Sequence, residues 1–285
     1  MRWSAGDRGN IEDARGGSGR RGGGLQLGLG GVVILLILSW ATGTDFLSLL
    51  GDPGAPSSGL SDSATPGDVQ STPQEERMVD FVDAVAGDTQ DVWQQLLSSR
   101  YERTRVVLFR DAVQSGCGAA ESATGPFYCP ADQKVYLDLG FFGELSDRFG
   151  APGDFAQAYV IAHEFGHHVQ HLLGTSDRVP GNSAGANSAS VALELQADCY
   201  AGVWGHEASK GGRFQAGKVE LDPGDAEEAL RAASVIGDDH LQKMSTGRVQ
   251  PERFTHGTSQ QRMEWFSRGM KTGDPRQCDT FSALR

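Results

Sequence analysis

Residues 154–173 read DFAQAYVIAHEFGHHVQHLL, and residues 188–208 read SASVALELQADCYAGVWGHEA. Apolar residues recur in both stretches at the three- and four-residue spacing of a helix, so we expect two helices here. The first helix is expected to begin at Asp154, where Gln157 completes a capping-box pattern, and to stop at Gly174. A few polar residues on these helices stand four apart, and this spacing indicates the chemistry.

A histidine pair one helical turn apart marks the first helix. Residues i and i+4 share one face, so His163 and His167 can direct imidazole nitrogens at a single zinc ion. Glu164 stands beside the first histidine, where its carboxylate can reach a zinc-bound water rather than the ion. The pattern HExxH fixes few positions and also arises by chance on charged helix faces. The apolar run AYVIA before it is unlike a solvated face and favours the metal site.

The second helix carries Glu194 and Asp198, again four residues apart. Two acids one turn apart on a largely apolar helix are costly to bury unless positive charge neutralises them. One zinc ion per chain, held by His163 and His167, would supply that charge, so we expect Glu194 to be the third ligand. Asp198 is expected to accept a hydrogen bond from a ligand histidine and orient it. The alternative interpretation is a solvated acidic edge.

Two other histidines of the first helix do not extend this site. The longer pattern HExxHxxGxxH is not met, because Gln170 and Leu173 occupy its later positions. His171 lies about 12 Å along the helix axis from His163, too far to share one ion. We expect His168 and His171 to be surface or structural residues.

The overall charge of the chain bears on which classes of partner it can bind. The 285 residues include 25 Lys and Arg against 37 Asp and Glu, a formal charge of −12. Nucleic-acid-binding proteins usually present a basic stripe, so this balance argues against nucleic acid as a partner. The length allows one large domain or two small ones with a sizeable core.

The first 44 residues predict a membrane anchor. Residues 1–24 are rich in Arg, Gly and Ser and predict a disordered cytoplasmic tail. Residues 25–44 are uncharged, mostly apolar and long enough to cross a bilayer as one transmembrane helix. Five arginines precede this span and no Lys or Arg follows its start until after Glu76, so the positive-inside rule places the rest of the chain outside the cytoplasm. The alternative is a signal peptide cleaved near Ala41 or Gly43.

The rest of the chain predicts one folded domain. Residues 45–74 are rich in Pro, Gly, Ser and Asp and predict a flexible linker, so the domain is expected over residues 75–285. Helices are expected over Glu75–Ala86 and Asp88–Ser99, and extended runs over Arg105–Phe109 and Gly125–Leu139, the last folded at its Pro-Ala-Asp-Gln turn. The expected fold class is α+β, a mostly helical domain with a small antiparallel sheet, preceded by a single transmembrane helix.

Export would make disulfides possible. The four cysteines contain no CxxC pair, which excludes a cysteine-rich structural zinc module. Cys117 and Cys129 bracket a Gly-rich loop and are the favoured pair, which leaves Cys199 and Cys278 as the second. Four free, partly buried thiols are the alternative.

Several separated segments resemble one family. HEFGHHVQH, ELQADCYAGVW, GPFYCPADQKVYLDLGFF and FTHGTSQQRMEWFSRG, spread over residues 75–270, resemble the bacterial neutral zinc metallopeptidase family. More distantly, HExxH followed by ExxxD resembles the gluzincin arrangement. The resemblance implies a zincin-like fold, with His163, His167 and Glu194 as zinc ligands and Glu164 as catalytic base. With the predicted span, it implies a single-pass protein of the bacterial plasma (inner) membrane with an extracytoplasmic catalytic domain.

The family resemblance also raises the question of an oxyanion donor. Zincins commonly place a His, Tyr or Arg opposite the base. His256 is our candidate, followed by Arg262 and His240, and a loop histidine that caps local backbone is the alternative for His256. Tyr128 and Tyr136 are expected to be packing residues.

The function expected from these observations is peptide-bond hydrolysis by a membrane-anchored zinc metalloendopeptidase. Zinc would activate a water with a pKa lowered towards ~7, Glu164 would take its proton, and a peptide would bind by strand addition to a hairpin edge. A non-enzymatic zinc-binding envelope scaffold or a chaperone-like protein is the alternative function.

Overall fold

The structure, a computed structural model, describes residues 1–16, 69–179, 183–211 and 217–282. Met1–Arg15 and Val69–Arg285 belong to one compact unit. The predicted transmembrane segment at 25–44 and most of the predicted linker at 45–74 lie outside the described residues.

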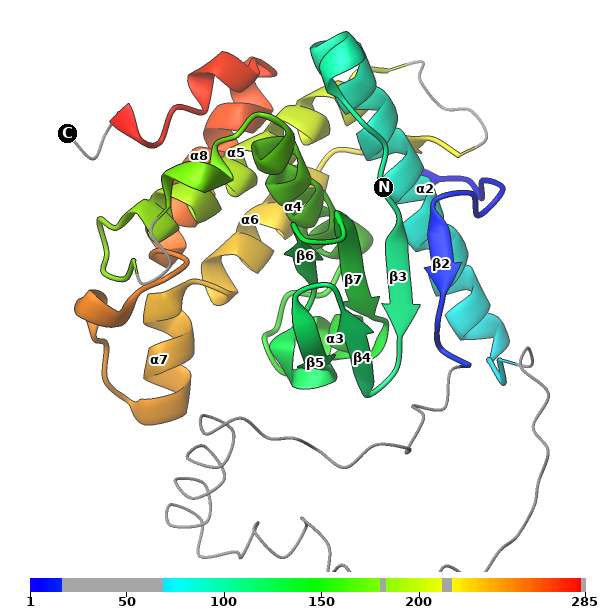
Figure 1. Cartoon of the computed structure of the whole chain (residues 1–285), viewed down its shortest axis with the longest axis horizontal. Coiled ribbons are helices and arrows are strands. Elements are labelled where there is room, and N and C mark those ends of the chain that lie inside the picture. Colours follow the sequence, from blue (N-terminus) through cyan, green and yellow to red (C-terminus); the bar gives the residue numbers. More distant parts are fainter. Residues whose placement is uncertain (17–68, 180–182, 212–216, 283–285) are drawn as a thin grey trace, which may run out of the picture. The chain divides into compact units, whose positions relative to one another are not determined.

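A four-stranded mixed sheet forms one part of this unit. Its strands are β2 (Ile11–Asp13), β3 (Val106–Phe109), β7 (Lys134–Asp138) and β6 (Phe127–Cys129), in that spatial order (Figure 1). β2, β3 and β7 run parallel, and only β6 runs antiparallel to its neighbour. The prediction of an antiparallel sheet was therefore wrong. The turn after β6 correctly indicated the β6–β7 hairpin, but the crossover that makes β3 parallel to β7 leaves no local signal.

Residues 1–16 were predicted to be disordered, and this was wrong. Ile11 is buried in the sheet, where β2 pairs with β3. The backbone N–H groups of Arg8 and Asn10 donate to Asp83 at 3.0 and 3.1 Å. The segment is polar and rich in Gly and Arg, which indicated disorder, but its polar groups find acidic partners on the following helix.

The expected transmembrane arrangement is also corrected. Within the described ranges, no helix is both long and apolar enough to cross a membrane. β2 and β3 are neighbours in one sheet, so residues 11–13 and 106–109 must lie on the same side of any membrane. A single crossing between them, with a cytoplasmic tail and an exported domain, does not fit this pairing.

Helices make up most of the described chain. They are α2 (Pro73–Leu97), α3 (Gly140–Asp147), α4 (Asp154–Leu172), α5 (Ala189–Ala208), α6 (Asp225–Val235), α7 (Asp238–Thr246) and α8 (Ser259–Thr272). α4 lies beside β6 and β7 and packs on α5, which packs in turn on α8 (Figure 1). Two short pairs complete the strands: β1 (Arg2–Trp3) with β8 (Val219–Glu220), and β4 (Ala112–Ser115) with β5 (Gly118–Glu121).

α2 is one continuous helix, whereas the sequence predicted two helices separated at Gly87. A Cβ atom on Gly87 would lie 3.0 Å from the side-chain nitrogen of Asn10. Gly87 therefore allows the N-terminal segment to approach α2. Asp88, the first residue of the second predicted helix, is buried and accepts a hydrogen bond from the indole N–H of Trp204 at 2.9 Å.

α4 begins at Asp154 as predicted, but without the predicted capping box. Instead, the Glu228 carboxylate of α6 accepts from the backbone N–H of Phe155 at 3.1 Å. The end of α4 is as predicted, with Gly174 just beyond the helix at a φ of 68°. Halfway along, a Cβ on Gly166 would lie 3.0 Å from the Cα and carbonyl oxygen of Ala197. Gly166 thus lets α4 and α5 approach closely at the level of HEFGH.

Both favoured cysteine pairs form disulfides, Cys117–Cys129 and Cys199–Cys278, so this prediction is confirmed. The first ties the β4–β5 hairpin to β6. The second ties α5 to the segment that follows α8.

Candidate metal centre

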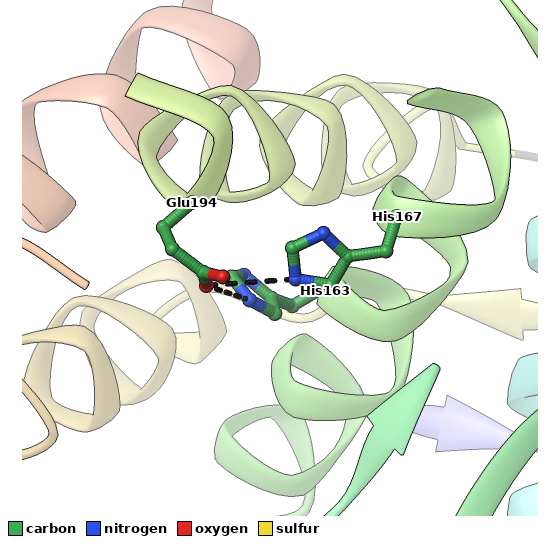
Figure 2. Close-up of side chains that lie close together, drawn as sticks. All are labelled: His163, His167 and Glu194. Atoms are coloured by element: carbon green, nitrogen blue, oxygen red, sulfur yellow. Dashed lines mark hydrogen bonds and ion pairs between the residues drawn. The ribbon is translucent and has the colours of Figure 1, made fainter. Parts of the chain in front are cut away.

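Three side chains from α4 and α5 converge on one point. The Nε2 atoms of His163 and His167 lie 3.1 and 3.5 Å from the same oxygen, Oε2 of Glu194. The two imidazole rings stand perpendicular, with centroids 4.8 Å apart, and Figure 2 shows both ring edges directed toward the glutamate. The three candidate ligand atoms all lie within 4.8 Å of one another.

This donor set fits zinc. Two neutral imidazole nitrogens and one carboxylate oxygen are the protein ligands of many catalytic zinc sites, which keep a fourth position for water or substrate. Glu194 is largely buried, with 17% of its side chain exposed, and a cation between it and the histidines would compensate its charge. The three residues predicted as ligands from the sequence are therefore brought together.

Asp198 lies behind His163, where the sequence predicted an orienting acceptor. Its Oδ1 lies 2.8 Å from Nδ1 of His163 and also accepts from the Tyr159 hydroxyl at 2.6 Å. Arg262 binds both carboxylate oxygens, with Nε 2.9 Å from Oδ2 and Nη2 2.9 Å from Oδ1. Asp198 is fully buried. The ring of His163 is therefore fixed by a carboxylate that is itself held on two sides.

The electrostatics of the centre favour bound positive charge. Burial alone would lower the pKa of the His163 imidazole, but Asp198 and Glu194 outweigh it and raise this pKa to about 10. Burial would raise the pKa of Asp198, but Arg262 and His163 hold it below the usual range. The pKa of Glu194 is likewise held low, mainly by His167 against the opposing effect of burial. Both carboxylates therefore stay ionised. Asp198 favours a proton on Nδ1 of His163, and Glu194 attracts a proton or a metal cation to the Nε2 atoms of the two histidines.

His167 has a different support, which the sequence reasoning missed. Its Nδ1 lies 2.9 Å from Oε1 of Gln170, three residues along α4. Gln170 is fully buried. The sequence signal that could have indicated this role was a polar residue, Gln170, on a largely apolar helix close to the candidate ligand His167.

The metal centre opens into a cleft of about 560 Å³. Glu164, the predicted base, lines this cleft and is 7% exposed. The lining also includes apolar and aromatic side chains from the β5–β6 connection, β6, α3 and the segment after α3: Pro126, Phe127, Tyr128, Phe141 and Phe149. β6 is an edge strand of the sheet, so its outer side faces no neighbouring strand among the described residues.

His256, the predicted oxyanion donor, lies in the loop before α8 and lines the cleft. Asp238 holds it by accepting from its backbone N–H at 2.7 Å, with Nδ1 of the ring 3.3 Å from Oδ1. Burial lowers the pKa of His256, but the contact with Asp238 outweighs it and raises the pKa. Arg262, the second candidate, is already bound to Asp198. His240 does not line the cleft.

His168, Tyr128 and Tyr136 make structural contacts. His168 is 1% exposed, and its ring nitrogens lie 3.0 Å from the Tyr128 hydroxyl and 2.7 Å from the Glu102 carbonyl oxygen. Tyr136 donates to Asp132 at 2.6 Å. Tyr128 packs as predicted but also lines the cleft.

The donor set is one that zinc sites of metallopeptidases use, and comparison with known families agrees with it. A family model described as "Putative neutral zinc metallopeptidase" matches residues 1–281, so the chain belongs to this family. The match begins at residue 1, as does the folded unit.

Relatives from two bacteria are similar to this chain. The "Uncharacterized protein YpfJ" of Escherichia coli (strain K12) is 44% identical over 299 residues, which cover 99% of each chain. The "Uncharacterized protein Rv2575" of Mycobacterium tuberculosis (strain H37Rv) is 48% identical over 204 residues, 70% of this chain and 69% of that protein. No solved structure matches the chain.

Proposed function

We propose that this family member is a zinc-dependent endopeptidase. The observation that carries the proposal is the convergence of His163, His167 and Glu194 at the floor of an open cleft that Glu164 also lines. A purely structural zinc site is closed by four protein ligands, whereas a catalytic site has three and an accessible position.

When bound, zinc would supply Lewis-acid chemistry to a water molecule and to a peptide carbonyl in the cleft. Glu164 is the general base: its carboxylate takes a proton from water and then delivers it to the amide nitrogen of the departing product. His256 acts as the oxyanion donor. Asp238 engages its Nδ1 and raises the pKa of the ring, so Nε2 donates from the protonated imidazole.

The substrate is a peptide in extended conformation. β6 lies at the edge of the sheet and contributes Phe127 and Tyr128 to the cleft. An added strand would pair with the backbone of β6 and pass the metal centre. The aromatic side chains beside it offer apolar contact for substrate side chains.

The two disulfides support a location in an oxidising compartment, because such bonds are reduced in the cytosol. An extracytoplasmic domain remains a prediction on this ground. A zinc-binding scaffold without activity is the second candidate. A scaffold that only holds zinc does not require a carboxylate at the cleft, whereas Glu164 places one there.

The test uses the full chain and its Glu164→Gln variant, purified with zinc and incubated with an unfolded protein. We expect the wild type to cleave it, a metal chelator to stop cleavage, and the variant to be inactive while still binding zinc. Glu144→Gln is the matched control, because Glu144 lines the cleft on α3 but lies outside the metal centre. Undiminished cleavage by Glu164→Gln would exclude Glu164 as the base.

A further inference from the structure

We propose that Gln170 and Gln196 are positioning residues for His167. Their amide groups form a chain of hydrogen bonds, here called the relay, that runs from His167 to the backbone carbonyl of Cys278 with one fixed donor-to-acceptor direction. The inference rests on the proposed zinc site. It assigns the second zinc histidine a support that reaches the C-terminal segment of the chain.

The relay consists of four hydrogen-bonded groups in a row. Oε1 of Gln170 lies 2.9 Å from Nδ1 of His167. The Gln170 amide nitrogen lies 2.6 Å from the Leu193 carbonyl oxygen and 3.2 Å from Oε1 of Gln196. The Gln196 amide nitrogen in turn donates to the Cys278 carbonyl oxygen at 2.8 Å.

The direction of these bonds is fixed by the backbone. A carbonyl oxygen can only accept, so Gln196 must turn its NH₂ group toward Cys278, and Gln170 must turn its own toward Leu193. The Gln170 oxygen is then left facing His167, and it too can only accept. His167 must therefore carry its proton on Nδ1, which leaves the lone pair of Nε2 directed at Glu194 and the metal position.

Both glutamines are buried, which makes their orientation hard to change. Gln170 is 0% and Gln196 6% exposed. A flipped amide would place like groups opposite one another, and buried polar groups without partners are costly. The tautomer of His167 is thus set by two backbone carbonyls that do not touch it.

The far end of the relay is held by covalent and polar contacts. Cys278 forms the disulfide with Cys199 of α5, and both residues are buried. Two residues further on, the Thr280 hydroxyl donates to the Ala192 carbonyl oxygen at 2.6 Å. The segment after α8 is therefore fastened to α5 on both sides of the carbonyl that anchors Gln196.

The two zinc histidines thus have unlike supports. His163 faces an ionised carboxylate paired with Arg262, whereas His167 faces a neutral amide. Loss of the amide relay leaves the charge of the centre unchanged, so its effect reports on orientation alone.

The experiment measures zinc affinity by competition with a chromophoric chelator, using the full chain and variants. Gln170→Met and Gln196→Met keep side-chain length but remove the amides, and each is expected to weaken zinc binding by about 10–100-fold. Gln90→Met removes a buried glutamine amide of α2 that bonds Asn10 and Thr104 outside the relay, and its zinc affinity is expected to equal that of the wild type.

A spectroscopic readout separates positioning from general stability. In the zinc-loaded wild type, proton–nitrogen NMR should show a protected Nδ1–H of His167. In Gln170→Met this proton should exchange rapidly with water, while the Nδ1–H of His163 stays protected because Asp198 is unchanged.

The outcomes separate this inference from the proposed function. Wild-type affinity in Gln170→Met, or a protected His167 Nδ1–H in that variant, would overturn the relay while leaving the zinc site intact. Equal losses in Gln90→Met and Gln196→Met would also overturn it, since the loss of any buried amide would then suffice. A folded wild-type chain that binds no zinc would overturn both.

Discussion

Asp198 and Arg262 form a buried two-point ion pair behind His163. Both distances are 2.9 Å, and the side chains are 0% and 4% exposed. The guanidinium group of Arg262 fixes the plane of the Asp198 carboxylate, so that Oδ1 of Asp198 is directed at Nδ1 of His163. The pair links α8 to the junction of α4 and α5, so three helices that are distant in sequence set the orientation of one imidazole.

Arg262→Met should be destabilising, because it leaves a buried carboxylate without its cation. We expect a loss of about 3–5 kcal/mol in the free energy of unfolding, measured by denaturant titration. Arg276→Met is the matched control, since Arg276 pairs with Asp274 at 88% exposure and its loss should leave the stability almost unchanged. Equal stability of Arg262→Met and the wild type would refute a structural role for the pair.

Gly166→Ala should push α4 and α5 apart. The added Cβ would lie 3.0 Å from backbone atoms of Ala197, which cannot move without shifting α5. We expect about 1–3 kcal/mol of destabilisation and weaker zinc binding, measured by unfolding and by chelator competition. Gly143→Ala in α3 is the control, because its Cβ would meet nothing within 4 Å and should leave the chain as stable or slightly more stable. Unchanged zinc affinity in Gly166→Ala would show that the helix separation is not critical.

The N-terminal strand should contribute to stability. Ile11 is 9% exposed against the sheet core, and Ile11→Ala should cost about 2–5 kcal/mol in the free energy of unfolding. Glu12→Ala on the same strand removes only the exposed pair with Lys134 and should cost about 1 kcal/mol or less. If both variants unfold like the wild type, β2 is not part of the cooperative unit.

Attachment of the N-terminal segment should depend on pH through Glu76. Hydrogen bonds from Ser71, Arg8 and Arg15 lower the pKa of this carboxyl from 4.5 to about 2. Because the folded-state pKa is depressed, the stabilisation is present above pH 4.5 and is lost as the pH falls toward 2. The protection factors of the backbone amides of residues 8–13, taken relative to the intrinsic exchange rate at each pH, should therefore fall over this window. In Glu76→Gln the contribution of this group should be absent, and an equal fall in protection in that variant would assign the pH effect to other groups.

The convergence of the three candidate ligands could be predicted from the sequence because its signals are local. His163 and His167 share one helix, Glu194 and Asp198 share another, and the i, i+4 spacing alone determines which side chains lie on one face. Glu194 and Asp198 stand on a largely apolar helix, where buried carboxylates need positive charge nearby. This indicated that their helix lies against the helix that carries the histidines. The contribution of Gln170 was missed, since an amide carries no charge that demands a partner.

The sheet was predicted poorly because its pairings are not local. Ile11 and Val106 are neighbours in adjacent strands, although a long intervening segment separates them in sequence. The polar residues around Ile11 resemble a disordered tail until their partners on α2 are known. The extended run at Phe127–Asp138 was correctly divided into a hairpin, because its turn residues are adjacent in sequence.

The central claim is that His163, His167 and Glu194 hold one zinc ion, and X-ray absorption at the zinc edge of the purified full chain tests it most directly. We predict one zinc per chain, coordinated by two imidazole nitrogens and by oxygen at about 2.0–2.2 Å. In Glu194→Ala the protein-oxygen contribution should be lost and the zinc content should fall. A folded wild-type chain without zinc, or with zinc bound by other ligands, would contradict the account.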